Sequence, residues 1–529
     1  MEFWEKSLRI FKCLCDHSWQ GVRRIAQQTG LSKSSVHRLT QAMERRDLHP
    51  ESWLWETAEG RQWLTRLVVA TLYTFGLKRG VGLETISEFL ARLRLERQVG
   101  CSPSALRPVM HALETALLET AAAWEKDGDA GREGREIIAA ADETFLERML
   151  LVLMDLRTGY LLLEEAADNR TYATWKALVD ERLTALNTSV RYLVSDRAQA
   201  LSQLAEKGLK CLSRPDFFHC LHELGKSYAL AIGQRLRHAQ QELTQAKEAL
   251  ARRQGLPQAA HDDPAAKALV EGRQAEVTRW EEVHQTYRSH LETLALTLHP
   301  FHISDSAPQT SAQVASTLRA TVEAIEALAQ HQQLPARPHA MSKVRKQVPA
   351  LAALVDFWWE GVGQDLAQAA ISTPWRQWAR EVLLPWVDWE HHMARTRGAR
   401  RKAQIRRVWE TGRAAFHAHT LTQRLPAQAL EAWRTWATQQ VQAFQRASSA
   451  VEGRNGALAQ LHHNQRGLPQ QRYKVWTILH NFDCRAPDGT TPATRFFGRR
   501  FPDLFETVAT YIETLPRPQQ RKHDVALSH

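Results

Sequence analysis

The stretch MLLVLMDLRTGYLLLEEA (Met149–Ala166) joins two apolar runs of strand length through the turn LRTG, which is typical of a β-hairpin. Three further short runs lie on either side of it, in EIIAAADETF (Glu136–Phe145), VRYLVSD (Val190–Asp196) and LKCLSRPDFFH (Leu209–His219). Helical patterns over Tyr172–Leu186 and Gln199–Glu206 separate the later runs. The order β-β-β-α-β-α-β-α predicts a mixed five-stranded sheet covered by helices.

The rest of the chain has the composition of a globular protein with a polyanionic partner. The 529 residues carry a net charge of +11 and 43% hydrophobic residues, which is enough for several domains. This charge balance favours nucleic acid as a partner. No apolar run approaches membrane-spanning length, and the first residues do not resemble a signal peptide. Six scattered cysteines fit reduced thiols, so we expect a cytoplasmic protein of the bacterial nucleoid, or a nuclear one.

The segment GVRRIAQQTGLSKSSVHRLTQAMERR (Gly21–Arg46) has the pattern of a helix-turn-helix. Gly30 permits the turn, and Ser32 can cap the second helix. That helix would present Lys33, Ser34, His37 and Arg38 to a DNA groove. A similar unit over Leu83–Leu113 predicts a second helical DNA-binding domain, and the polar KDGDAGREGRE (Lys126–Glu136) predicts a boundary after it.

Two carboxylates stand at the ends of predicted strands. Asp142 lies near the end of the first strand, and Asp196 ends the fourth. If these strands are neighbours, the two side chains meet at one edge of the sheet, where ligands bind in open α/β folds.

This order of motifs resembles the ribonuclease-H-like core of DDE-type bacterial insertion-sequence transposases and retroviral-type integrases. The resemblance rests on five segments: ADETF (Ala141–Phe145), DLRTGYLLLEE (Asp155–Glu165), VRYLVSD (Val190–Asp196), SSAVEGRNGAL (Ser448–Leu458) and DGTTPATRFFGRRFPDLF (Asp488–Phe505). It implies a DNA transposase that binds transposon ends, cleaves DNA strands and joins them to target DNA.

The resemblance also implies a catalytic triad of Asp142, Asp196 and Glu452. These acids would hold two Mg²⁺ ions, with Mn²⁺ as a substitute, at the roughly 3.5–4 Å separation of two-metal sites. Asp142 would bridge both ions. His219 and Asn455 are possible accessory residues, and Arg454 is expected to contact DNA.

Some alternatives stay open at this point. Glu143 could replace Asp142 as the ligand, while Asp155 is expected in a turn, and Glu164 and Glu165 in solvent at a strand end. The spacing of Cys211, His219, Cys220 and His222 matches no zinc site, and neither do the pairs His391–His392 and His462–His463.

Residues 226–445 predict a large helical insertion that begins with an antiparallel coiled-coil hairpin. Its nine later tryptophans are expected mainly in the core. The acid-free run RTRGARRKAQIRR (Arg395–Arg407) predicts phosphate contacts from Arg400, Arg401, Lys402, Arg406 and Arg407.

The sequence therefore predicts a multidomain, mostly α-helical protein. We expect helix-turn-helix domains at 1–60 and 61–126, a catalytic core at 134–225 and 446–485, the insertion at 226–445, and a tail at 486–529. Its partner would be double-stranded DNA, bound by a homodimer or larger assembly, with no membrane. The alternative function is a domesticated or inactive transposase that binds DNA without cutting it.

Overall fold

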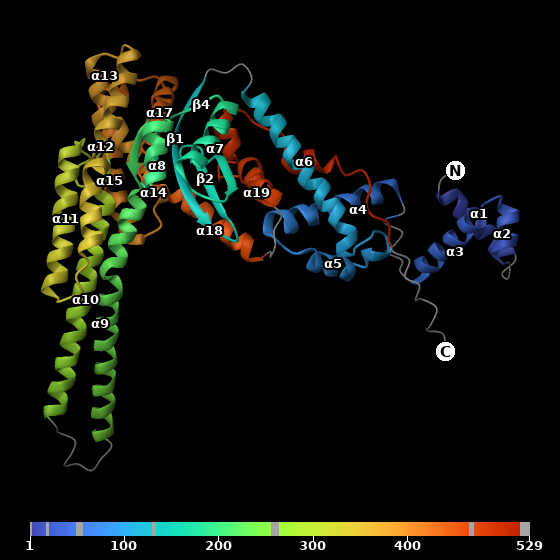
Figure 1. Cartoon of the computed structure of the whole chain (residues 1–529), viewed down its shortest axis with the longest axis horizontal. Helices are drawn as coiled ribbons and strands as arrows, with labels where there is room; N and C mark the ends of the chain where they lie inside the picture. Colours follow the sequence, from blue (N-terminus) through green and yellow to red (C-terminus); the bar gives the residue numbers. More distant parts are fainter. Residues whose placement is uncertain are drawn as a thin grey trace. The chain divides into compact units, whose positions relative to one another are not determined.

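The computed structural model describes residues 3–16, 21–48, 55, 57–129, 134–254, 264–464 and 470–518 (Figure 1). It is mostly helical, with one five-stranded mixed sheet. The chain divides into two compact units. One comprises residues 1–132 and 456–529, and the other comprises residues 133–455.

The sheet belongs to the unit of residues 133–455 and has the order β3-β2-β1-β4-β5. Its strands are β1 (Arg135–Phe145), β2 (Met149–Asp155), β3 (Leu161–Ala167), β4 (Thr188–Ser195) and β5 (Leu212–Pro215). The first three strands pair antiparallel, while β4 runs parallel to β1 and β5 parallel to β4. The expected mixed sheet is therefore present.

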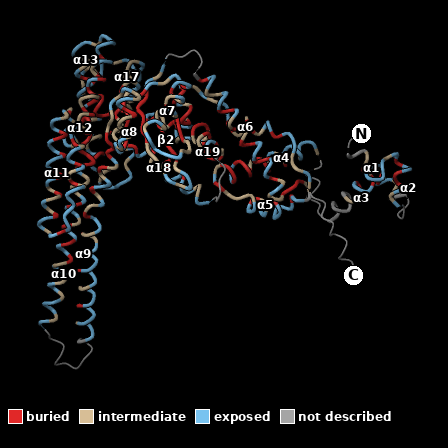
Figure 2. The backbone as a smooth tube through the Cα atoms, viewed as in Figure 1, coloured by how far each residue is buried: buried red, intermediate tan, exposed pale blue. Residues whose placement is uncertain are grey.

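Alternation along β1 gives the sheet two different buried faces. Ile138 and Ala140 pack into the large core that the insertion helices share, and Asp142 has the same parity. Ala139 and Ala141 are also buried but have the opposite parity, which they share with Glu143. Figure 2 shows the buried positions gathered on the strands and on the inner sides of the neighbouring helices. Asp142 and Glu143 therefore project to opposite faces of the sheet.

Two helical segments connect the later strands. The helix α7 (Tyr172–Ala185) links β3 to β4. The helix α8 (Gln199–Gln203) and the π-helical segment η4 (Leu204–Gly208) link β4 to β5. Trp175, Val179 and Leu183 form the buried side of α7, as their spacing predicts.

The insertion begins with two long helices, α9 (Phe217–Gln254) and α10 (Pro264–Thr297), which pack side by side as the expected hairpin (Figure 1). Residues 255–263, between these two helices, lie outside the described residues. The following helices are α11 (Ser311–His331), α12 (Pro338–Gln368), α13 (Thr373–Trp378), η6 (Ala379–Leu383), α14 (Leu384–Arg395), α15 (Ala399–Ala418), α16 (Thr420–Gln423) and α17 (Ala427–Gln442). All nine predicted core tryptophans are buried in this core or packed against it.

The helix α18 (Ser449–Asn464) runs from one unit into the other, since the division falls after Asn455. We expected residues 446–485 to belong with the sheet. Instead, residues from Gly456 onward group with the N-terminal unit.

The N-terminal unit starts with α1 (Phe3–Asp16), α2 (Val22–Thr29) and α3 (Lys33–Leu48). Ile10, Ile25, Ala26, Val36 and Leu39 form a small core among them. Gly30 takes a φ of 69° in the turn, and the Ser32 hydroxyl accepts a hydrogen bond from the Ser35 amide at 3.2 Å. The turn and the cap both follow the sequence prediction.

The remaining helices of this unit are α4 (Ala58–Thr71), η2 (Leu72–Leu77), α5 (Leu83–Arg92), η3 (Leu95–Arg97), α6 (Pro103–Asp129), α19 (Gln470–Asp483), α20 (Pro492–Phe497) and α21 (Leu504–Ala509). The late helices α19 and α21 pack on α6. Arg472 and Glu114 form a buried ion pair between α19 and α6, with Nε 2.5 Å from Oε1. The sequence predicts a tail at residues 486–529. Instead, the described part of this region contributes α20 and α21 to the N-terminal unit. Among the described helices, none combines the length and the apolar character that a membrane span needs.

Candidate active site

Three half-buried side chains from distant parts of the chain converge at the sheet. Asp142 on β1, His219 on α9 and Glu452 on α18 each place one potential ligand atom within 4.8 Å of the other two. His219 Nε2 lies 3.3 Å from Glu452 Oε1. Two of the three acids predicted from the sequence are therefore brought together, and the accessory candidate His219 joins them.

The start of α18 is held against the sheet by two polar contacts. Asp142, Val152 and Glu164 form one row across β1, β2 and β3, according to the strand registers. Asn455 Nδ2 donates a hydrogen bond to Asp142 Oδ2 at 2.9 Å, and the Arg454 guanidinium binds both oxygens of Glu164 at 2.8 and 2.6 Å. These contacts hold Glu452 beside Asp142, because they lie within one helical turn of it.

Asp216 fixes the beginning of the same helix. This buried residue follows β5 and accepts hydrogen bonds from the Phe218 amide at 2.8 Å and the Ser448 amide at 3.1 Å. The Ser448 hydroxyl also donates to Asp216. One carboxylate therefore caps α9 and anchors the residue that precedes α18. An aspartate before a helix is a recognisable capping signal, but its second contact, 232 positions away, has no sequence signal.

The electrostatics of the cluster fit a cation site. Burial first, and then the nearby Glu452 carboxylate, raise the pKa of Asp142 to about 7. The carboxylates of Asp142 and Glu452, each with an oxygen within 4.8 Å of the other, repel each other when both are ionised. A divalent cation between them would remove that repulsion.

We expect Asp142→Asn to change how the stability of the metal-free protein depends on pH. The folded pKa of about 7 exceeds the ordinary value of 3.8, so the folded state binds this proton more tightly. That stabilisation is complete below pH ~4 and is lost as the pH rises to ~7. The melting temperature of the wild type should therefore fall between pH 5 and 8 by several degrees more than that of the variant, as scanning calorimetry would measure. Parallel curves for both proteins would contradict the raised pKa.

Asp196 does not join this cluster. The ladder of β1 and β4 pairs Ala140 with Val194, so Asp142 and Asp196 each lie two residues further along neighbouring strands. However, β4 ends at Ser195, and the exposed Asp196 accepts a hydrogen bond from the Ala198 amide at 2.7 Å. Its charge contributes to the raised pKa of Glu143, for which burial is the larger cause.

Glu143, the alternative ligand, faces the other side of the sheet. Its Oε2 lies 3.6 Å from Arg170 Nη1, and Glu143 is not part of the cluster around Asp142. Among the two neighbouring acids, the geometry favours Asp142.

Arg454 and Glu164 correct two sequence predictions. Arg454 was expected to contact DNA and Glu164 to lie in solvent, but their side chains are only 7% and 0% exposed and pair with each other. A basic residue near a candidate active site looks like a phosphate ligand until its acidic partner on a distant strand is known. Asp155, in contrast, agrees with its prediction as a residue of the hairpin turn. It is buried and accepts a hydrogen bond from the Thr158 amide at 3.1 Å.

The basic run Arg395–Arg407 spans the end of α14 and the start of α15. Arg406 and Arg407 are exposed, whereas Arg401 and Lys402 are half-buried. Arg400 is exposed, and its Nε lies 3.5 Å from Glu292 Oε2. Arg406 and Arg407 are thus the predicted phosphate ligands that remain most available. On α3, Lys33, Ser34, His37 and Arg38 are all exposed on one helix.

Comparisons with known proteins identify two regions of the chain. Residues 5–48 match the IclR helix-turn-helix domain, and residues 379–524 match a family of unknown function (DUF6399). No curated protein matches the chain. The first match confirms the helix-turn-helix, and a domain of this type suggests DNA as a partner. The second match includes Glu452 but neither Asp142 nor His219.

Proposed function

We propose that the protein is a DDE-type DNA transposase that cleaves DNA strands and transfers them with divalent metal ions. The observation that carries this proposal is the convergence of Asp142 and Glu452, which lie on different elements at opposite ends of the insertion. A large helical insertion between two acids that meet at the sheet is what the transposase resemblance implies.

The sheet supports the same proposal. Its three antiparallel strands are followed by two crossovers to parallel strands, in the order β3-β2-β1-β4-β5. This arrangement fits the ribonuclease-H-like core that the sequence suggests. Asp142 lies in β1 and Asp196 directly follows β4, and these two strands are direct neighbours.

The donor set fits a hard divalent cation. Mg²⁺ prefers oxygen ligands and tolerates water in its remaining positions, so Asp142 and Glu452 would hold it. Held there by Asp142 and Glu452, such an ion would supply the activation of a water or 3′-hydroxyl nucleophile and the stabilisation of a leaving oxygen that phosphodiester chemistry needs. His219 carries nitrogen, which suits Mg²⁺ less well, and we assign it to orienting Glu452 through their 3.3 Å contact.

A second metal position would need Asp196. Its carboxylate would have to leave the Ala198 amide and turn toward Asp142. Exchange of one exposed hydrogen bond costs little, about 1 kcal/mol, compared with the bonds a carboxylate makes to a dication. Asp142, Asp196 and Glu452 would then together hold the two ions that the resemblance implies.

DNA contacts of α15 are testable through their salt dependence. Because each lost phosphate contact reduces the slope of log K against log salt by about 0.9, changing Arg406 and Arg407 to Gln should reduce it by about 2. Fluorescence anisotropy with a labelled duplex at several salt concentrations measures the slope. The exposed Arg424 offers a control, since Arg424→Gln should leave the slope nearly unchanged. An unaltered slope in the double variant would place the phosphate contacts elsewhere.

The function itself is tested with a supercoiled plasmid that carries the gene and its flanking DNA. With Mg²⁺, the wild-type protein should nick or linearise this plasmid at the borders of the element, and chelation should stop the reaction. Binding to the borders without any cleavage would support the alternative, a transposase-derived protein that acts only by binding DNA.

A further inference from the structure

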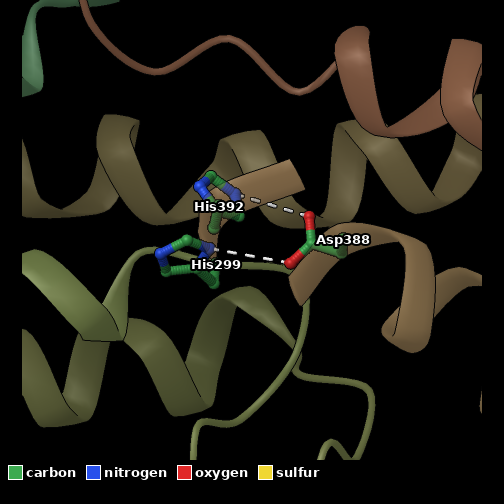
Figure 3. Close-up of side chains that lie close together, drawn as sticks. All are labelled: His299, Asp388 and His392. Atoms are coloured by element: carbon green, nitrogen blue, oxygen red, sulfur yellow. Dashed lines mark ion pairs between the residues drawn. The ribbon is translucent and has the colours of Figure 1, made fainter. Parts of the chain in front are cut away.

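A second cluster of potential metal ligands lies inside the helical insertion. His299, which follows α10, and Asp388 and His392 on α14 each place a ligand atom within 4.8 Å of the others. Figure 3 shows Asp388 facing the two adjacent imidazoles, with one oxygen directed to each. Asp388 Oδ2 is 3.9 Å from His299 Nδ1, and Asp388 Oδ1 is 3.5 Å from His392 Nε2.

Three polar atoms of this cluster, from Asp388 and His299, are buried without a hydrogen-bond partner among the described residues. The side chains of Asp388 and His299 are 1% and 2% exposed, and His392 is 21% exposed. Within the described part of the chain, both Asp388 oxygens and His299 Nδ1 lack a hydrogen-bond partner. A carboxylate buried in this way costs several kcal/mol unless a cation compensates it.

The charge of Arg446 attracts the Asp388 carboxylate, but no hydrogen bond to its oxygens is formed by the described residues. Arg446 donates hydrogen bonds to the carbonyl oxygens of Leu298 and, at 3.2 Å, of Ala295. Arg401 contributes positive charge, but its buried Nε has no hydrogen-bond partner among the described residues. Burial first, and then the charge of Arg446, hold the pKa of His299 well below its ordinary value.

We propose that His299, Asp388 and His392 bind one first-row transition-metal ion of the zinc class. Two imidazoles and one carboxylate are a known zinc ligand set, and water would complete a tetrahedral site through the partly exposed side of His392. Zinc bonds of about 2.0–2.1 Å place ligand atoms roughly 3.3–3.5 Å apart, so small side-chain movements would close the cluster. The neighbouring guanidinium groups repel any cation, which favours a metal that bonds strongly to nitrogen over Mg²⁺ or Ca²⁺.

The bound metal would connect the segment after α10 to α14 in the interior of the insertion. Arg446 touches the same segment through Leu298, and its carbonyl accepts a hydrogen bond from the Phe217 amide at 3.0 Å. Ser448, two residues further along, is bound by Asp216. Hydrogen bonds of Arg446 therefore link the segment that carries His299 to the residues that hold the start of α18. We assign the metal site a structural role.

The experiment measures zinc retained by the full chain. Protein saturated with Zn²⁺ and dialysed against metal-free buffer should retain about one molar equivalent more zinc than His392→Gln treated in the same way. His391→Gln is the matched control, because His391 is adjacent but outside the cluster, and it should retain the wild-type amount. Glu452→Gln should also retain it, which separates this site from the candidate active site.

A second measurement keeps the proposal testable if His392→Gln folds poorly. Co²⁺ added to the wild-type protein should produce the visible absorption of a four-coordinate site, and Zn²⁺ should displace it. Zn²⁺ should also raise the melting temperature of the wild type but not of Asp388→Asn. Equal zinc in the wild type and in folded His392→Gln, or no four-coordinate Co²⁺ absorption, would overturn the proposal.

Discussion

Replacing Glu452 with Gln should reduce Mg²⁺-dependent DNA cleavage by on the order of 10³-fold or more. Substituting groups that only support metal ligands already costs roughly 10–100-fold, and Glu452 is a proposed ligand itself. The amide keeps the shape of the side chain but cannot offer the negative charge that the ion requires. Cleavage of the plasmid described above, quantified over time, measures the loss.

The same variant should keep its DNA affinity within about twofold, because the helix-turn-helix and α15 remain unchanged. Glu410→Gln on α15 is a matched control for the loss of one acid, since Glu410 is exposed and outside the cluster. If Glu452→Gln cleaves as fast as the control, Glu452 is not a metal ligand and the proposed triad fails.

The second large effect concerns the buried pair of Arg454 and Glu164. Arg454→Met should destabilise the unit of residues 133–455 by about 3–5 kcal/mol, because it removes the guanidinium that pairs with the fully buried Glu164 carboxylate. The melting temperature of that unit should fall by on the order of 10 °C. Scanning calorimetry measures this change, and limited proteolysis of α18 should report the loosened helix.

Two further variants distinguish this explanation from a simple loss of packing. Glu164→Leu combined with Arg454→Met should recover much of the lost stability, since no charge then remains buried. Arg406→Met removes an exposed arginine and should change stability by less than about 0.5 kcal/mol. A single variant as stable as Arg406→Met would show that the pair does not hold α18.

Much of the fold follows from local patterns in the sequence. Short apolar runs bounded by turn residues predict the strands around Met149–Asp155, and the 3.6-residue spacing of Trp175, Val179 and Leu183 predicts α7. Gly30 and Ser32 predict the turn of the helix-turn-helix, because a left-handed turn and a cap each need particular residue types.

The candidate site was only partly predictable, because its geometry depends on contacts between distant residues. Asp142 and Asp196 could be placed from the ends of two neighbouring strands, whereas Glu452 came from resemblance alone. The Arg454 pair and the second contact of Asp216 join residues 290 and 232 positions apart, and no local pattern carries such information. For the same reason His391–His392 looked unsuited to zinc, since the other ligands lie on Asp388 and the distant His299.

The orientation of Asp196 has a different cause. Its strand position was predictable, but its side chain turns to the Ala198 amide instead of toward Asp142. Local hydrogen bonds of this kind compete with a shared ligand whenever a carboxylate starts a loop. The domain boundary predicted near residue 446 also differs from the observed one. The observed boundary falls inside α18, which continues without interruption from the sheet unit into the N-terminal unit.

The most direct test of the central claim is metal rescue at Asp142. Asp142→Cys should lose plasmid cleavage in Mg²⁺, because a thiolate is a poor ligand for that hard ion, and should regain it at least partly in Mn²⁺ or Zn²⁺. Asp142→Ala should stay inactive in all three metals. Rescue of the cysteine variant alone would show that the residue at position 142 binds the catalytic ion. Full Mg²⁺-dependent cleavage by Asp142→Ala would contradict the account.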